Sequence, residues 1–216
     1  MDTGLQNRIN ESISQAYKGN LTADALIRLV NDCLDQSPDR KIIHQFLDLA
    51  HIQSVAKTIS KAKVTKEWLE RVVQLIHLSQ FHTGTMIEQR AKRYGDKTVF
   101  NMIRGNDLHT LSYSDLWSKI QMTGKALSVL DRPEKPSVIG LLTYNQLNGV
   151  LVDLACLSFG IRVIPIPLNS TSEHLSYILK QSEITHIFVG GKTAIRLWNE
   201  VHHNYDILVI GLNDSN

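Results

Sequence analysis

The residues with the clearest chemical potential are a glycine pair, a lysine and a threonine within HIFVGGKTAIRLW, the stretch from His186 to Trp198. Residues 191–193 match the tail of the loop G-x-x-x-x-G-K-[ST], whose backbone N–H groups surround the phosphates of ATP or GTP. His186 occupies the first-glycine position, however, and the apolar residues 187–189 favour a strand over an open arch. We therefore predict a tight strand-to-helix turn. The helix N-terminus that follows it retains a weak attraction for phosphate.

Other reactive side chains show no arrangement typical of a catalytic or metal site. Cys33 and Cys156 are the two cysteines and lie in no C-x-x-C or Cys/His pattern, which favours two buried thiols in a reducing compartment. His77 and His82 have the wrong spacing to share a helix face, and the pair at 202–203 is typical of an exposed helix end. G-x-G-x-x-G is also absent, so the sequence contains no dinucleotide-binding fingerprint. We predict no metal site.

The composition gives no support to a nucleic-acid partner or a membrane location. The 216 residues contain 23 Lys plus Arg and 21 Asp plus Glu, so the net charge of +2 supplies no basic surface for nucleic acid or an anionic membrane. The most apolar region, Val150 to Leu168, is broken by Asp153, Arg162 and two prolines, and is too interrupted to span a bilayer. The polar N-terminus lacks the apolar stretch of a signal peptide. We expect no transmembrane segment, no nucleic-acid partner and a cytoplasmic location.

Residues 1–82 have the apolar periodicity of helices and no strand pattern. Thr22 is the expected N-cap of one helix, Ser37–Pro38 the expected start of another, and Thr65 the expected cap of a long amphipathic one. The predicted apolar stripe of this last helix consists of Trp68, Leu69, Val72, Val73, Ile76 and Leu78. We predict a small helical extension, with a cap, a dimerisation element and a membrane-surface contact as open alternatives for its role.

Residues 83–216 change to a mixed pattern. TVFNMIR and HTLSY flank Gly105–Asn106–Asp107, a hairpin signal, and Ser112 with Asp115 forms an expected capping box. The segments SVIGLLT, RVIPI, HIFVG and DILVIGL then alternate with helical segments, one of which is expected to end at Gly160 and another to begin with a second capping box at Ser170. Short β-branched strands alternating with helices predict a mostly parallel sheet covered by helices on both faces. The predicted fold class is α/β, preceded by the helical extension.

Several of these segments together resemble the N-terminal part of the adenylate-forming (AMP-binding) superfamily, which includes acyl-CoA synthetases, firefly luciferase and peptide-synthetase adenylation domains. The matching stretches are LSYSDLWSKIQMTGKAL, SVIGLLTYNQLNGVLVDLACLSFGIRVIPI and LNSTSEHLSYILKQSEITHIFVG. The family's T-Y-x-E-L helix start corresponds to residues 112–116, its strand-ending Asn to Asn145, and its L-A-C-L segment to residues 154–157. Its usual Gly-Asp before the next strand is replaced by residues 135–137, Lys-Pro-Ser. The segment VIPIPLNSTSEHLSYIL is most similar to the corresponding segment of fatty acyl-CoA synthetases.

The resemblance implies a parent chemistry in which ATP activates a carboxylate to an acyl-adenylate, which is transferred to the thiol of CoA or a carrier protein. The family's phosphate loop [ST]-G-[ST]-[ST]-G-x-P-K-G and its Y-G-x-T-E element do not occur in these 216 residues. We therefore nominate no catalytic residue and expect the segment alone to be inactive, with no cofactor of its own. ATP, Mg and CoA are expected for the full-length parent, whose substrate we expect to be a medium- or long-chain fatty acid.

Lys192 and Arg196 are the only site residues that the resemblance suggests, as contacts for the nucleotide of CoA. Two solvated basic residues on a helix face are the alternative interpretation. The expected partners are the remainder of the chain's own catalytic domain and, through the helical extension, a second copy of the chain. The competing hypothesis is a free-standing degenerate synthetase fragment that acts as a protein-interaction module.

Overall fold

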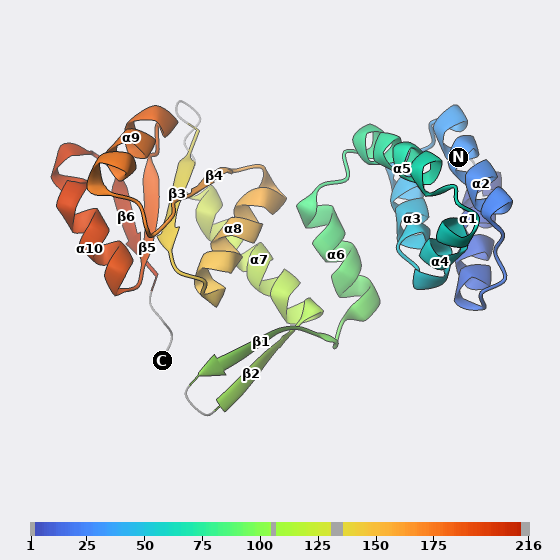
Figure 1. The fold of residues 1–216 in the computed structure, drawn as a ribbon, viewed down its shortest axis with the longest axis horizontal. Helices are drawn as coiled ribbons and strands as arrows, with labels where there is room; N and C mark the ends of the chain where they lie inside the picture. The colour runs from blue at the N-terminus through green and yellow to red at the C-terminus, as the bar shows by residue number, and fades with distance from the viewer. Residues whose placement is uncertain (1–2, 105–106, 131–135, 213–216) are drawn as a thin grey trace. The chain divides into compact units, whose positions relative to one another are not determined.

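The computed structural model describes residues 3–104, 107–130 and 136–212. The chain divides into two compact units, Met1–His82 and Thr83–Asn216. Figure 1 shows that the described part of the first unit consists of helices and loops, whereas the second unit combines helices with strands. Among the described residues, no helix has the length and apolar character needed to cross a membrane.

Five helices make up the described part of the first unit. They are α1 (Thr3–Tyr17), α2 (Ala23–Gln36), α3 (Arg40–Ala50), α4 (Gln53–Lys61) and α5 (Thr65–Ser79). Thr22 caps α2 as predicted, because its Oγ1 accepts a hydrogen bond from the backbone N–H of Ala25 at 3.3 Å. The predicted start of α3 at Ser37–Pro38 is wrong. Ser37 ends α2 in the left-handed region at φ 42°, and Asp39 caps α3 by accepting a hydrogen bond from Lys41 N–H at 2.8 Å.

The core of the first unit lies between these five helices. Phe46 of α3 and Trp68 of α5 meet at its centre, with ring centroids 5.7 Å apart. The remaining buried members are Leu5, Ile9, Ala16, Leu26, Leu29, Val30, Cys33, Ile43, Leu47, Leu49, Ile52, Val55, Ile59 and Leu75. All of them come from the first unit, so this unit encloses a hydrophobic core of its own.

Helix α5 is less buried than its sequence predicts. Trp68 and Leu75 are buried, but Leu69, Val73 and Leu78 of the predicted stripe are 54%, 48% and 53% exposed. A helix packed against neighbours on one side buries a stripe about 100° wide, and these three residues lie outside it. The expected cap is also displaced, since Val64 is the N-cap and Thr65 the first helical residue.

The second unit opens with a helix and a β-hairpin. Helix α6 (Thr83–Tyr94) precedes β1 (Thr98–Arg104), which pairs antiparallel with β2 (Asp107–Ser112). This pairing confirms the predicted hairpin, whose expected turn residues Gly105 and Asn106 lie outside the described residues. Helix α7 (Tyr113–Ser128) follows. Its predicted cap is confirmed, because Ser112 Oγ accepts a hydrogen bond from Asp115 N–H at 3.1 Å and donates one to Asp115 Oδ2 at 2.7 Å.

The remaining strands form one parallel sheet. Strands β3 (Val138–Thr143), β4 (Arg162–Pro165), β5 (His186–Gly190) and β6 (Leu208–Gly211) lie in the order β4-β3-β5-β6, and every neighbouring pair is parallel. This confirms the predicted α/β class and its parallel sheet. The sequence order shows that the chain leaves β3 toward one side of the sheet, to β4, and later returns to the other side, to β5.

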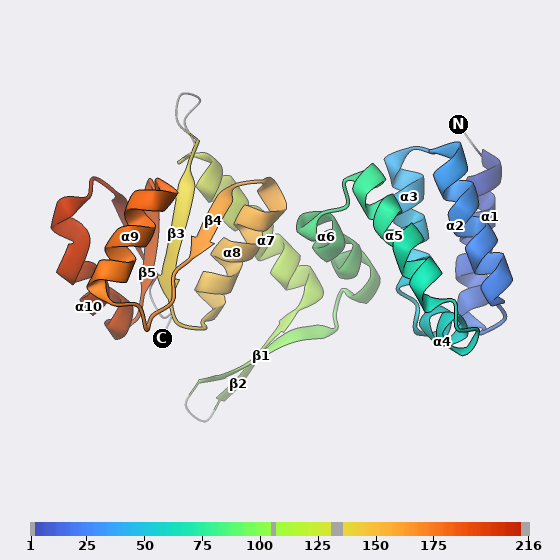
Figure 2. The ribbon, with the colours of Figure 1, turned by 45° about the horizontal axis from the view of Figure 1, so that its top comes forward.

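Helices cover both faces of this sheet. Figures 1 and 2 show α7 and α8 (Leu147–Phe159) on one face, and α9 (Ser172–Ser182) and α10 (Lys192–Val201) on the other. The side chains of the central strand β3 pack against the helices on both faces. Ile139 and Leu141 pack with α7 and α8, while Val138 and Leu142 pack with α9 and α10, because successive side chains of a strand point to opposite faces.

The C-terminus of α8 and the N-terminus of α9 test two predicted helix boundaries. Gly160 ends α8 in the left-handed region at φ 73°, as predicted for a glycine at a helix C-terminus. The predicted capping box at Ser170 is displaced by one residue. Thr171 is the N-cap of α9, and its Oγ1 accepts a hydrogen bond from His174 N–H at 3.2 Å.

Candidate functional site

The carboxyl edge of the parallel sheet is the part of the second unit where the fold favours ligand binding. In open α/β sheets, ligands bind outside the carboxyl ends of the strands, near the place where the strand order reverses. That reversal lies between β3 and β5, because α8 follows β3 on one face and α10 follows β5 on the other. The loops after these two strands therefore form the candidate site.

The loop after β5 is the stretch that resembles a phosphate-binding loop, and the structure confirms the predicted strand-to-helix turn. His186–Gly190 is a strand that pairs with β3 on one side and with β6 on the other. The backbone groups that would surround a phosphate are thus committed to the sheet. Gly191 is the N-cap of α10 at φ 89°, a conformation that glycine adopts without strain.

Both glycines of this turn are required by the loop after β3. A Cβ atom on Gly190 would stand 2.2 Å from Gln146 Nε2 and 2.5 Å from Thr143 Oγ1, and one on Gly191 would stand 2.6 Å from the Tyr144 ring. The Gln146 amide is fixed by donating to Thr143 Oγ1 at 2.6 Å. Sequence reasoning found the turn but missed this close approach, which joins residues more than forty positions apart.

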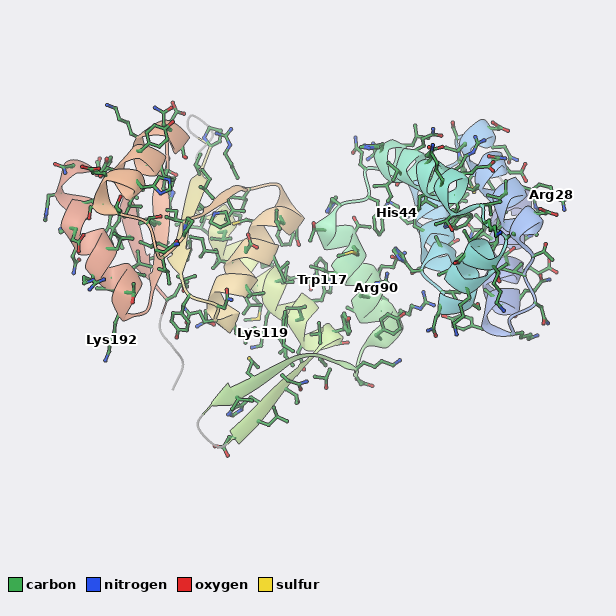
Figure 3. The ribbon with its side chains drawn as sticks, viewed as in Figure 1. Arg28, His44, Arg90, Trp117, Lys119 and Lys192 are labelled. Carbon is green, nitrogen blue, oxygen red and sulfur yellow. The ribbon has the colours of Figure 1, made fainter. Side chains whose placement is uncertain are left out.

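Lys192 and Arg196 lie on α10, where the sequence placed them. Both side chains are exposed on the first two turns of the helix, and neither forms an ion pair within the part of the chain that the structure describes. Figure 3 shows Lys192 extending into solvent. Their positions four residues apart leave both available to a phosphate-bearing ligand, and their contact with the nucleotide of CoA stays a prediction.

A small cavity opens beside α8 at the same edge of the sheet, and we call it the α8 crevice. Its volume is about 190 Å³. It lies between the first half of α8 and the ends of β3 and β4, and its lining residues are Leu141, Thr143, Tyr144, Asn145, Gln146, Gly149, Val150, Asp153, Pro165 and Ile166. The lining combines apolar side chains with side chains that carry hydroxyl, amide and carboxyl groups.

Asp153 is the charged residue of the α8 crevice. The side chain is half-buried, and burial raises the pKa of its carboxyl group above the usual value. Within the described ranges, the carboxylate forms no ion pair and accepts no hydrogen bond. Sequence analysis treated Asp153 only as an interruption of an apolar region, since nothing in the local pattern indicates a cavity.

The two cysteines have the environment predicted for structural thiols. Cys33 and Cys156 are both buried and free, and burial raises the pKa of each thiol to about 12. Such thiols carry almost no thiolate at neutral pH and are poor nucleophiles. Among the residues that the structure describes, no three His, Cys, Asp or Glu side chains gather in a way that could hold a metal ion.

Comparison with known proteins identifies a family match over the second unit. Residues 87–212 match a family model described as AMP-binding enzyme. No curated protein matches the chain. The matched residues begin in α6 and end just after β6, so they contain the hairpin, the parallel sheet and both helix layers.

Solved structures share the fold of about three fifths of the chain. A Mycobacterium tuberculosis fatty acyl CoA synthetase has a TM-score of 0.53 and 17% identity, over 61% of this chain and 26% of that chain. A benzoate CoA ligase from Burkholderia xenovorans LB400 has a TM-score of 0.53 and 16% identity, over 62% of this chain and 26% of that chain. The N-terminal domain of FACL13 from Mycobacterium tuberculosis, with inhibitor bound, has a TM-score of 0.54 and 16% identity, over 61% and 33%. The chain thus spans about a quarter to a third of the length of these proteins.

Proposed function

Since this chain belongs to the AMP-binding enzyme family, we propose that it forms the N-terminal part of an ATP-dependent, AMP-forming acyl-CoA synthetase. In the proposed reaction, a carboxylate oxygen attacks the α-phosphorus of ATP and releases pyrophosphate. The thiol of CoA then attacks the acyl carbon and releases AMP. The observation that carries the proposal is the family match over 87–212, a region that folds into the parallel sheet with helices on both faces.

The described residues have a supporting role in this proposal. Phosphoryl and acyl transfer depend on cations and hydrogen-bond donors placed around the developing charge. The phosphate loop of the family is absent from the sequence, and the two thiols are buried and protonated. We therefore assign no catalytic residue to residues 1–216. The segment would form one wall of the active site through the carboxyl edge of its sheet, and the rest of the catalytic domain would be its partner.

ATP, Mg²⁺ and CoA belong to the proposed full-length enzyme. We propose no Mg²⁺ ligand within residues 1–216. Lys192 and Arg196 are the proposed contacts for the phosphates of the CoA nucleotide. The support for this is their exposure on one face of α10 next to its N-terminus, where the helix dipole also favours an anion.

The proposed acid is a medium- or long-chain fatty acid. The support comes from the resemblance of residues 163–179 to fatty acyl-CoA synthetases. The solved fatty acyl CoA synthetase and benzoate CoA ligase are equally similar to this chain, at TM-scores of 0.53, so the shared fold does not separate the two acid classes. An aromatic acid therefore belongs in any substrate panel.

The helical unit supports a second candidate function, a protein-interaction module that joins two copies of the chain. This unit lies outside the family match and has its own core, and α5 exposes Leu69 and Val73 one helical turn apart. A self-associating chain would be a dimer by sedimentation, and Leu69→Glu would return it to a monomer. A monomer at all accessible concentrations would remove this candidate.

ATP–pyrophosphate exchange tests the main proposal. The assay compares residues 1–216 with a chain extended through the reading frame to include a phosphate loop, using acids from acetate to palmitate and benzoate. We expect exchange from the extended chain with a chain-length optimum, and none from residues 1–216. Exchange by the pure 216-residue chain would overturn the assignment of a non-catalytic role. An extended chain that shows no exchange with any acid would overturn the synthetase assignment.

A further inference from the structure

The α8 crevice contains an unusual charge. Asp153 is the only charged residue in α8, whose sequence LNGVLVDLACLSF is otherwise apolar or uncharged. Helix α8 packs against α6, α7, β3 and β4, and no described lysine or arginine from these elements, those of α6 included, forms an ion pair with Asp153. A half-buried carboxylate without a partner loses hydration without gaining a compensating interaction.

Hydrogen-bond acceptors line the α8 crevice together with this carboxylate. The Gln146 amide nitrogen donates to Thr143 Oγ1 at 2.6 Å, and the Thr143 hydroxyl donates to the Tyr144 carbonyl at 3.2 Å. The Thr143 hydroxyl proton and one of the two amide hydrogens of Gln146 are therefore directed to protein atoms. The amide oxygen of Gln146 accepts no hydrogen bond from the described residues. A ligand in the α8 crevice therefore meets oxygen acceptors and the negative charge of Asp153, together with the side-chain amide groups of Asn145 and Gln146.

The apolar part of the lining of the α8 crevice favours a hydrocarbon group. It consists of Leu141, Val150, Pro165 and Ile166, none of which carries a polar side-chain atom. The volume of about 190 Å³ corresponds to about six water molecules at roughly 30 Å³ each. The space therefore fits a small molecule with one polar end and a body of a few carbons.

We propose that the α8 crevice binds the ammonium group of a small primary amine, with Asp153 as its counter-ion and the apolar lining residues in contact with a short alkyl body. An ammonium group supplies three hydrogen-bond donors and a full positive charge, which matches the carboxylate of Asp153 and the amide oxygen of Gln146. The negative charge of Asp153 disfavours a carboxylate ligand. This site rests on the geometry of the α8 crevice and does not depend on the proposed synthetase activity.

Calorimetric titration of the 216-residue chain with n-butylammonium chloride tests this proposal. n-Butanol and sodium butyrate, which have bodies of the same length without the positive charge, are titrated in parallel at constant ionic strength. We expect saturable binding of n-butylammonium in the millimolar range, with n-butanol and butyrate at least about tenfold weaker, because a hydrogen bond to a charged group is worth about that factor. Equal binding of all three compounds would overturn the proposal.

Two variants separate the specific site from general charge effects. Asp153→Asn keeps the size of the side chain and removes the charge, so we expect at least about a tenfold loss of n-butylammonium affinity. Glu173→Gln removes an exposed carboxyl group on α9, which packs on the other face of the sheet, and should leave the affinity unchanged. An equal loss in both variants would show nonspecific charge attraction and overturn the site.

Carbon NMR of the Asp153 carboxyl group measures the pKa of this group, which a general stabilisation of the fold would not change. A bound positive charge favours the ionised carboxylate, so saturating n-butylammonium should lower the pKa of Asp153. Absence of both binding and a pKa change would overturn the proposal.

Discussion

The Tyr144 ring lies so close to Gly191 that a Cβ atom at position 191 would stand 2.6 Å from both Cδ1 and Cε1 of the ring. The two residues belong to the loops after β3 and β5, the neighbouring strands between which the strand order reverses. This contact explains why the sequence contains a glycine at the very place where a phosphate-binding loop would also need one. The glycine here allows two loops to pack.

Gly191→Ala should therefore destabilise the second unit. The substitution adds a methyl group against the Tyr144 ring and forces a non-glycine residue to φ 89°. We expect a loss of about 2 kcal/mol or more in the free energy of unfolding, measured by urea denaturation. The control is Gly211→Ala, because nothing lies within 4 Å of a Cβ atom there. It should change the stability by less than about 0.5 kcal/mol.

A double variant divides this loss into its two causes. Tyr144→Ala removes the ring, so Gly191→Ala should cost less in the Tyr144→Ala background than in the original chain. The part that remains reports the backbone strain at position 191. If the cost of Gly191→Ala were the same in both backgrounds, the steric contact with Tyr144 would contribute nothing to the requirement for glycine.

The sequence predicted the fold of the second unit well because its strands and helices differ in period and composition. All four parallel strands lie where short β-branched segments alternate with helical ones, and Gly160 ends α8 as expected. Single helix starts were less predictable. Ser170 and Thr171 are both good caps, and the local pattern contains nothing that selects the second of them.

The parts that the sequence could not predict depend on contacts between distant segments. The apolar stripe predicted for α5 contains more residues than the face that is buried. The neighbouring helices decide how much of the stripe is covered, and the sequence of α5 does not contain that information. The α8 crevice lies between a helix and the ends of two strands, and its existence follows from how they pack. Asp153 therefore has no local signal that would distinguish it from a solvated carboxylate.

Lys192→Ala and Arg196→Ala test the proposed CoA contact in the extended enzyme. Each removes an exposed charge, and an exposed charge contact is worth up to about 1 kcal/mol, so we expect the KM for CoA to rise about two- to fivefold. The KM for ATP and kcat should change little. Lys180→Ala, an exposed lysine in the last turn of α9, is the matched control. An equal rise in the KM for CoA in all three variants would point to nonspecific charge attraction.

The two thiols should be unreactive in the folded chain. With the pKa of Cys33 and Cys156 raised to about 12, roughly one part in ten thousand is thiolate at pH 8, and both side chains are also buried. We expect no labelling by a thiol-reactive dye on the time scale of minutes, and labelling of two thiols per chain in guanidinium chloride. Rapid labelling of either cysteine in the native chain would show that its helix opens readily.

Asp153→Asn should change how the stability of the second unit depends on pH. Burial raises the pKa of this carboxyl group in the folded chain, so between the unfolded and the folded pKa the folded state binds more protons than the unfolded state. The free energy of unfolding of the original chain therefore falls as the pH rises through that window, and the loss is complete above the folded pKa. Asparagine carries no charge and removes this loss. Below the usual aspartate pKa of about 3.9, the stability of the variant should match that of the original chain apart from a constant offset. As the pH increases, the variant should become more stable relative to the original chain, up to a plateau.

Urea denaturation from pH 3 to pH 8 in the absence of amines measures the difference, and Glu173→Gln provides the comparison for an exposed carboxyl group. A relative stability of Asp153→Asn that falls with pH would mean that the carboxylate is favourably paired in the folded chain, contrary to the unpartnered charge on which the ammonium site depends.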